Sequence, residues 1–337
     1  MAVLRANGLG DLMFSLPALD ALRAAYPEAE IVLLGLDWHD DLLGGRPGPV
    51  NRVVSVAPGL DVLTGGDEGP AEGFFASMVA ERFDLAVQLH GGGRHSNPFV
   101  RQMGAGLTAG LQAPGAEPLD RCVPYVYYQN EILRLLEVVS LVGAPVVALE
   151  PRLVVTPDDL DAGAQALPPD VRPLAVLHPG ATDPRRRWPP ERFAAVAERL
   201  VGAGAQVAVV GTEDERDLGQ RIAATAGVDV DDLVGRLSLS ALVGLLARSA
   251  VVVADDSGPL HLAAALRAAT VGIYWCGNLI NAGPMTRARH RPAVSWRLRC
   301  PDCGLDCTRA TCDHHSSFVA DVAVDEVASS ALELLVS

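Results

Sequence analysis

Short, nearly uninterrupted apolar runs alternate along the first half of the chain with segments that have helical spacing. Runs of strand length occupy residues 2–6, 30–35, 52–56 and 84–90, and an amphipathic segment occupies 12–26. Strands that are apolar throughout are buried on both faces, and intervening helices place successive strands in parallel. The alternation therefore predicts a doubly wound α/β domain with helices on both sides of a parallel sheet.

The same alternation returns after a segment rich in proline and aspartate at residues 157–173. A length of 337 residues suits two domains. We predict Rossmann-like domains at 1–160 and 161–317 that face each other, and a helix within 318–337 that packs back towards the first domain. Ligands of such sheets bind outside the carboxyl ends of the strands, which here means the interdomain cleft. The second half is expected to contain strands at 174–178, 206–211, 251–256 and 270–275, and helices at 190–204, 213–227, 238–249, 259–267 and 322–337.

Acidic residues outnumber basic ones by 41 to 27, which gives a formal net charge of −14. A surface with this excess repels nucleic acid and anionic lipid over about a Debye length. No run approaches the roughly 18 apolar residues that span a bilayer. The N-terminus lacks the basic start and the cleavage site of a signal peptide. We therefore expect a cytoplasmic protein with no nucleic-acid partner and no integral membrane segment.

The sequence RANGLGD, residues 5–11, follows the first predicted strand and opens the first helix. Gly8 and Gly10 allow a tight turn and close approach of the backbone to a ligand. The motif is an incomplete dinucleotide fingerprint, because it has no third glycine and because Asp11 would repel a pyrophosphate. Two interpretations of Asp11 stay open: a carboxylate that stabilises the helix N-terminus, or one that accepts a proton from a substrate.

Three consecutive arginines, Arg185, Arg186 and Arg187, follow a glycine-containing turn in HPGATDPRRRWPP, residues 178–190. The turn leads from a predicted strand into a helix whose N-terminus offers free backbone N–H groups and a positive dipole end. Arginine can add paired hydrogen bonds to phosphate oxygens. The arrangement predicts a phosphate site, and the alternative is a solvated loop on an acidic protein.

The sequence VVVADDSGPLHLAAAL, residues 251–266, leads from a buried strand into another helix. Ser257 and Gly258 precede Pro259, which suits the first turn of a helix. This helix start is a second anion-binding position. We expect His261, in the same turn, to contact the ligand, with a packed side chain as the alternative. Two helix starts and the arginines in one domain fit a diphosphate better than a single phosphate.

These motifs, in this order, resemble the lipopolysaccharide heptosyltransferases of glycosyltransferase family nine, bacterial enzymes with the GT-B fold. The resemblance is carried by residues 8–31, 84–94, 178–200 and 255–266. Two departures stand out. The family usually has lysine where Arg186 stands, and the loop YWCGNLINAGP, residues 274–284, replaces a family pattern like FGPTDP. That loop borders the donor site in the family, so the departure concerns the base or the sugar of the donor.

The resemblance implies an inverting displacement in which Asp11 is the general base and Arg186 stabilises the departing diphosphate, with no catalytic cofactor. It also implies a nucleoside-diphosphate sugar donor, with ADP-heptose as the first candidate, whose ribose meets Glu213. The acceptor would offer a hydroxyl group on a glycan or a small molecule. The expected donor-binding residues are Gly8, Gly10, His178, Gly180, Ala181, Thr182, Arg186, Glu213, Asp256, Ser257, Gly258, Pro259 and His261, and the expected acceptor-binding residues are Asn7, His90 and Arg94.

The charge of the chain bears on the identity of the acceptor. Lipopolysaccharide core is a phosphorylated, carboxylated lipid at an anionic membrane, and this acidic chain shows no basic amphipathic helix that would bind there. We therefore hypothesise a soluble natural-product acceptor, with a lipopolysaccharide core heptosyltransferase as the alternative. Two other classes stay open: a non-catalytic sugar-nucleotide-binding protein, and a nucleotide-dependent oxidoreductase. Asp11 disfavours the oxidoreductase, as does Gly35 at the position of an acidic ribose ligand.

Four of the six cysteines, Cys300, Cys303, Cys307 and Cys312, crowd together and are followed by His314 and His315. Thiolate sulfur and imidazole nitrogen are the usual ligands of zinc, although this spacing is not that of paired zinc knuckles. The sequence leaves two interpretations open. The four cysteines hold a structural zinc ion, or they are free or oxidised thiols.

Overall fold

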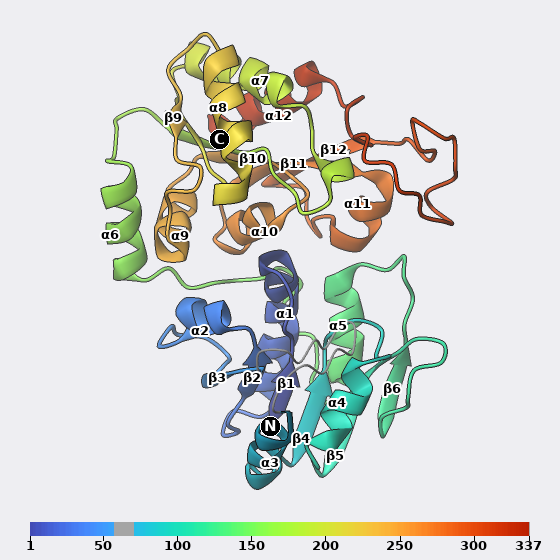
Figure 1. The fold of residues 1–337 in the computed structure, drawn as a ribbon. Helices are drawn as coiled ribbons and strands as arrows, with labels where there is room; N and C mark the ends of the chain where they lie inside the picture. Colours follow the sequence, from blue (N-terminus) through green and yellow to red (C-terminus); the bar gives the residue numbers. More distant parts are fainter. Residues whose placement is uncertain (57–70, 337) are drawn as a thin grey trace. The chain divides into compact units, whose positions relative to one another are not determined.

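A computed structural model describes residues 1–56 and 71–336 and divides the chain into two compact units, Met1–Val154 and Val155–Ser337. In the part of the chain that is described, each unit contains a sheet of six strands, and every strand pairing is parallel (Figure 1). The doubly wound α/β architecture predicted from the sequence is therefore confirmed.

The sheet of the first unit has the strand order β3-β2-β1-β4-β5-β6. Alternate strand residues such as Leu4 and Leu34 pack with Phe99 and Met103 in one buried cluster, and α1 packs against α5. The strand order reverses its direction between β1 and β4. The elements are β1 (Ala2–Leu4), α1 (Leu9–Ala25), β2 (Val32–Gly35), α2 (Asp37–Leu43), β3 (Arg52–Ser55), α3 (Ala71–Ala80), β4 (Leu85–Gln88), α4 (Ser96–Gln102), β5 (Leu107–Gln112), β6 (Arg121–Pro124) and α5 (Glu131–Ser140).

The second unit repeats this topology with the order β12-β11-β10-β7-β8-β9, which reverses between β7 and β10. A buried cluster joins one face of this sheet to α7 and α12, whereas Leu260 of α10 meets the sheet at Gly272. The elements are α6 (Pro157–Ala166), β7 (Leu174–His178), η1 (Pro184–Arg186), α7 (Pro190–Gly202), β8 (Gln206–Val209), η2 (Glu213–Glu215), α8 (Arg216–Thr225), β9 (Asp231–Asp232), α9 (Leu239–Ala247), β10 (Val251–Asp255), α10 (Gly258–Ala265), β11 (Ala269–Trp275), α11 (Cys276–Ala282), β12 (His290–Ser295) and α12 (Val324–Leu335).

The boundary between the units falls at Val154 and Val155, a little before the predicted division at 160 and 161. The reason is a close contact of α6 with α9. A Cβ atom on Gly244 would lie 1.8 Å from the carbonyl oxygen of Asp159, so the two helices touch backbone to backbone. The Asp159 carboxylate also accepts a hydrogen bond of 2.8 Å from Ser240. Helix α6 therefore belongs wholly to the second unit.

The C-terminal helix α12 packs into the core of the second unit. Its apolar residues, including Val327, Ala331 and Leu334, are buried in the core of the second unit, against α7 and strands β10 and β11. Its apolar stripe covers one face of the second unit's own sheet, and packing of this helix towards the first domain stays a prediction. Across the described residues no helix, α12 included, combines the length and the apolar character needed to cross a membrane.

Candidate active site

The predicted site residues gather at the two points where strand order reverses. In a parallel sheet, the loops on either side of such a reversal diverge and leave a crevice at the carboxyl ends of the strands. Residues 5–11 follow β1 and residues 89–94 follow β4 in the first unit. Residues 178–187 follow β7 and residues 256–261 follow β10 in the second unit. Sequence motifs far apart in the chain thus become neighbours within each unit.

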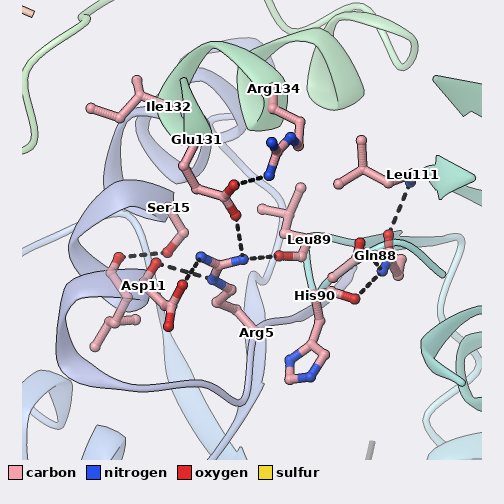
Figure 2. Close-up of polar contacts among 12 residues, drawn as sticks. Arg5, Asp11, Ser15, Gln88, Leu89, His90, Leu111, Glu131, Ile132 and Arg134 are labelled. Atoms are coloured by element: carbon pink, nitrogen blue, oxygen red, sulfur yellow. Dashed lines mark hydrogen bonds and ion pairs between the residues drawn. The ribbon is translucent and has the colours of Figure 1, made fainter. Parts of the chain in front are cut away.

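In the first unit, Asp11 is held by a buried arginine that the sequence analysis did not single out. The side chain of Arg5 is only 1% exposed, and its NH2 group lies 3.0 Å from Asp11 Oδ1. The same guanidinium donates to the carbonyl oxygens of Asp11 and Leu89 and lies 3.1 Å from Glu131 Oε1 (Figure 2). Arg5 thus ties the loops after β1 and β4 to the start of α5.

The charges around Arg5 balance. Glu131 also pairs with Arg134, whose guanidinium donates to the carbonyl oxygens of residues 126, 127 and 129. Two cations and two carboxylates therefore share one cluster, which is the condition under which buried charge is tolerated. Only Asp11 reaches solvent appreciably, since its side chain is 43% exposed whereas that of Glu131 is 15% exposed.

Asp11 lies in the first turn of α1, where a negative charge interacts favourably with the helix dipole. Within the described residues, however, its carboxylate bonds to Arg5 rather than to a backbone N–H of the helix. This pairing fixes Oδ1 and leaves the carboxylate half-exposed in the first turn of α1, after the carboxyl end of β1. The geometry is compatible with both interpretations of Asp11. Its charge can stabilise the N-terminus of α1 while its second oxygen, Oδ2, accepts a proton from a substrate.

His90 joins the two loops of this edge. The backbone N–H of Ala6 donates to His90 Nδ1 over 3.1 Å, so the neutral ring carries its proton on Nε2. His39 has the same tautomer, because Leu36 donates to its Nδ1 and its Nε2 lies 3.2 Å from the carbonyl oxygen of Asn7. Burial lowers the pKa of His39 to about 4, so this second histidine is a neutral structural support for the loop.

The acceptor-binding residues predicted from the sequence are not equivalent. Asn7 and His90 lie beside Arg5 and Asp11 at the strand ends, whereas Arg94 is exposed in the turn before α4. Asn7 Oδ1 is buried and has no hydrogen-bond partner in the described part of the chain. A buried carbonyl oxygen of this kind normally has a partner, which makes Asn7 a better candidate for substrate contact than Arg94.

In the second unit, His178 links the ends of β7 and β10. Ser257 Oγ lies 3.0 Å from His178 Nδ1, and Glu215 Oε2 lies 3.4 Å from His178 Nε2. Burial by itself would raise the pKa of Glu215, but hydrogen bonds from His178 and Thr212 lower it to about 2. A Cβ atom on Gly180 would lie 1.8 Å from Glu215 Oε1, so a larger residue at that position would displace the Glu215 carboxylate from its present place.

Glu215 is therefore the anchored acidic residue after β8, whereas Glu213 is the residue predicted to meet the donor ribose. The side chain of Glu213 is 66% exposed, and Arg216 donates to its Oε1 over 2.8 Å. Both carboxylates lie on η2, at the same end of the sheet as His178. The assignment of Glu213 to the donor ribose stays a prediction, and an exposed carboxylate at a strand end does not conflict with it.

Glu215→Gln is expected to lower the free energy of unfolding at pH 7 and to flatten its dependence on pH. The carboxylate titrates at about 2 in the folded chain against an ordinary value of 4.5. Its stabilisation is thus complete above pH 4.5 and is lost as the pH falls towards 2. A shift of this size corresponds to at most about 3 kcal/mol. Urea unfolding from pH 7 to pH 3 measures it, with Glu213→Gln as the exposed control. Parallel pH profiles for wild type and Glu215→Gln would contradict the assignment.

The three arginines have three different surroundings. Arg185 is paired with Asp183, with a shortest N–O distance of 2.6 Å, and Arg187 donates to the carbonyl oxygen of Ala181 over 2.8 Å. Arg186 instead reaches across to the loop after β10, where its NH1 group lies 3.2 Å from Asp256 Oδ2. The loop 178–190 and the loop after β10 therefore meet through Arg186, and a phosphate site at this point stays a prediction.

Asp256 receives a second partner from the first turn of α10. His261 Nε2 lies 3.0 Å from Asp256 Oδ1, so Arg186, Asp256 and His261 form one chain of charged and polar groups. The first-turn backbone N–H groups of α10 have no side-chain cap, because Ser257 Oγ bonds to His178 and to the carbonyl oxygen of Asp255. An uncapped helix start beside an arginine can bind an anion.

Asp255, the residue before Asp256, fixes the loop of residues 178–190 to the sheet. This loop carries the three arginines and is called the arginine loop. The side chain of Asp255 is completely buried, and both carboxylate oxygens accept from the backbone N–H of Trp188, at 3.0 and 3.1 Å. Burial raises the pKa of Asp255 well above its usual range. The two adjacent aspartates of the DDSGP motif therefore differ. Asp255 is buried and holds the backbone of Trp188, whereas Asp256 faces Arg186.

The cysteine cluster also differs from its prediction in one member. The ligand atoms of Cys300, Cys303, Cys312 and His314 all lie within 4.8 Å of one another, so this group could hold a metal ion. Cys307, which we had predicted as a ligand, is not in the group, and its Sγ atom lies 3.5 Å from the carbonyl oxygen of Leu305. The chain turns between Cys303 and Cys312 in a way that spacing alone did not reveal.

Comparison with known proteins supports one family throughout. A family model described as "Glycosyltransferase family 9 (heptosyltransferase)" matches residues 74–294. Lipopolysaccharide heptosyltransferase 2 of Escherichia coli K12 is 27% identical over 293 residues, which cover 81% of each chain. The solved structure of E. coli ADP-heptose lps heptosyltransferase II has a TM-score of 0.77 at 22% identity and covers 99% of this chain and 98% of that one. A family 9 glycosyltransferase from Veillonella parvula DSM 2008 gives 0.79 at 17% identity, with coverage of 99% and 96%. The chain therefore belongs to glycosyltransferase family 9 and has the GT-B fold, built from two Rossmann-like units.

Proposed function

We propose that the protein is an inverting glycosyltransferase that moves a heptose or a related sugar from a nucleoside diphosphate to an acceptor hydroxyl. The observation that carries this proposal is the chain Arg186–Asp256–His261 beside the uncapped start of α10. Both features lie where the strand order of the second unit reverses. Family membership supplies the reaction class, and ADP-heptose is the first donor to test because the similar E. coli structure is named for it.

On the donor side, the two phosphates would lie between Arg186 and the first-turn N–H groups of α10. As the bond from the anomeric carbon to the phosphate oxygen breaks, its electron pair stays with the diphosphate, and negative charge grows there. Donors already in place at that position stabilise the growing charge without reorganisation. An arginine fork and backbone amides are sufficient donors, so we propose that the transfer needs no metal ion.

On the acceptor side, Asp11 would take the proton of the attacking hydroxyl while the new bond from oxygen to the anomeric carbon forms. Attack from the face opposite the leaving group inverts the configuration of the sugar. Arg5 holds Oδ1 of Asp11, so the second oxygen is the proton acceptor, and the acceptor hydroxyl must reach it within hydrogen-bond distance. Asn7 lies in the same loop after β1, and its buried Oδ1 would accept a hydrogen bond from the acceptor.

A binding experiment tests the donor half of the proposal. Isothermal calorimetry with ADP-heptose, GDP-hexoses, dTDP-sugars and UDP-sugars should show binding of one nucleotide class, and ADP alone should bind if the diphosphate carries the affinity. NADH and NADPH form the control for an oxidoreductase. β2 ends at Gly35, where an NAD site would present an acidic residue to the ribose, so we expect no binding of NADH. Binding of NADH or NADPH without binding of any sugar nucleotide would refute the proposal.

The acceptor is a separate question. Relatives named for lipopolysaccharide favour a core heptosyltransferase, whereas the net charge of −14 favours a soluble acceptor, and we keep the soluble acceptor as the hypothesis. Sedimentation with anionic liposomes, beside a transfer assay on a lipid A–Kdo core, decides between them. Tight liposome binding or efficient transfer to that core would refute the soluble acceptor without affecting the donor assignment.

A further inference from the structure

The four possible ligand atoms all lie in the segment between β12 and α12. Cys300 and Cys303 lie on one tight turn, which is closed by a hydrogen bond of 3.0 Å from the Gly304 N–H to the Cys300 carbonyl oxygen. Gly304 has a φ of +73°, a conformation that favours glycine. A second bond, of 2.9 Å, runs from the Cys300 N–H to the carbonyl oxygen of Leu305. The turn therefore brings both sulfurs of the CPDCG sequence to one side of the backbone.

We propose that Cys300, Cys303, Cys312 and His314 bind one structural zinc ion, and that this ion holds the arginine loop in the shape that binds the donor. Three thiolates and one imidazole are a common ligand set of closed, tetrahedral structural zinc sites. Disulfide pairing suits the group less well, because a bond between any two of the three sulfurs would leave the third sulfur and the imidazole beside it. The second half of this inference rests on the proposed function.

The residues that follow His314 connect the cluster to the arginines. Ser316 Oγ donates to Asp302 Oδ1, inside the cysteine turn, over 3.0 Å. Ser317 Oγ then donates to the carbonyl oxygen of Arg187 over 2.6 Å, and the Phe318 N–H donates to that of Arg185 over 2.7 Å.

The ring of Phe318 also supports this loop from the side. It lies 5.7 Å from the guanidinium carbon of Arg185, a distance at which cation and ring attract each other. Segment 316–318 thus bonds to the residue before Arg186 and to the residue after it. A metal ion that fixes both Cys303 and His314 removes the freedom of this segment, and the segment in turn restrains the arginine loop.

Matched variants in the same segment separate ligands from neighbours. Cys303 and His314 are exposed, so Cys303→Ser and His314→Ala remove ligands without opening a core. Cys307→Ser and His315→Ala make the same chemical changes outside the ligand group. Elemental analysis after loading with zinc should find about one zinc ion per chain in wild type and in both controls, and much less in Cys303→Ser and His314→Ala. Cobalt loading should give the absorption spectrum of tetrahedral, thiolate-bound cobalt in the same three proteins.

The connection to the arginines is measured without a donor as well as with one. In Cys303→Ser, backbone amides of residues 183–188 should exchange hydrogen faster than in Cys307→Ser. If loss of zinc leaves the loop in its binding shape only about a tenth of the time, the Kd for ADP rises about tenfold.

Separate results would contradict the ligand set, the coupling to the arginine loop and the proposed function. A wild-type chain that takes up no zinc, or a Cys307→Ser chain that loses zinc as fully as Cys303→Ser, overturns the ligand set. Loss of zinc with unchanged exchange at 183–188 overturns the coupling. Failure of wild type to bind ADP counts against the proposed function alone, because zinc content and hydrogen exchange are measured without it.

Discussion

The Asp11→Asn variant is expected to lose between about 10²- and 10⁴-fold in turnover while it keeps nearly the wild-type affinity for the donor. Asparagine has almost the same shape as aspartate but cannot accept the proton of the attacking hydroxyl. Its side-chain oxygen can still accept from Arg5, so the loop after β1 should keep its conformation. Turnover is measured under saturating donor and acceptor, and donor affinity by calorimetry with ADP.

Two controls distinguish the loss of a general base from a general effect on the helix or on stability. Asp20→Asn makes the same change further along α1, and should leave turnover near wild type. The free energy of unfolding of Asp11→Asn must be measured beside its turnover, because Arg5 is 1% exposed and loses one of its two carboxylate partners in this variant. A variant that retains more than about a tenth of wild-type turnover would show that Asp11 is not the general base. The favourable charge at the start of α1 would then be the better interpretation.

The sequence was most informative where strands are buried on both faces. The apolar runs at 2–6 and 174–178 correspond to β1 and β7, and each is fully buried at the centre of its sheet. Strands β5 and β6 were not predicted, since β5 contains Gly110, a weak strand former, and β6 is a short edge strand of partly exposed residues. Gly110 is required there because a Cβ atom would lie 2.7 Å from Gln88. Such a contact between strands is invisible in the local pattern.

In the candidate site, too, features set by neighbouring residues were predicted, whereas contacts between residues far apart in the sequence were not. The motifs at the ends of β1, β7 and β10 were found because a turn, a glycine and a helix start follow one another directly in the chain. Arg5 and Glu131 were missed because their contact joins residues that lie 126 positions apart. The contact of Glu215 with His178 was not predicted, because it joins loops that follow two different strands, β8 and β7. The presence of His314 rather than Cys307 in the group of possible metal ligands likewise depends on the path of the chain between Cys303 and Cys312.

The arginine cluster provides the second prediction with a large effect. Arg186→Ala should lower kcat/KM for the donor by at least about 10², and part of this loss should appear in kcat. An interaction with the leaving diphosphate strengthens as charge develops on it, so its removal affects the chemical step as well as binding. Arg185 and Arg187 are the matched controls on the same loop. Arg185→Ala and Arg187→Ala should have smaller effects, because one guanidinium is paired with Asp183 and the other with the carbonyl oxygen of Ala181.

A third variant separates charge from geometry at this position. Arg186→Lys keeps the cation and restores the residue that is usual in the family, but it replaces a planar fork with a single ammonium group. If the phosphates are bound by charge alone, Arg186→Lys should retain most of the donor affinity. If the paired hydrogen bonds matter, its kcat should fall towards that of Arg186→Ala. Equal losses in all three alanine variants, which disappear together as salt is raised, would instead identify the loop as a general cationic patch. Asp256 keeps His261 as a partner in every one of these variants, so their unfolding free energies should remain close enough for the kinetic differences to be assigned to the donor site.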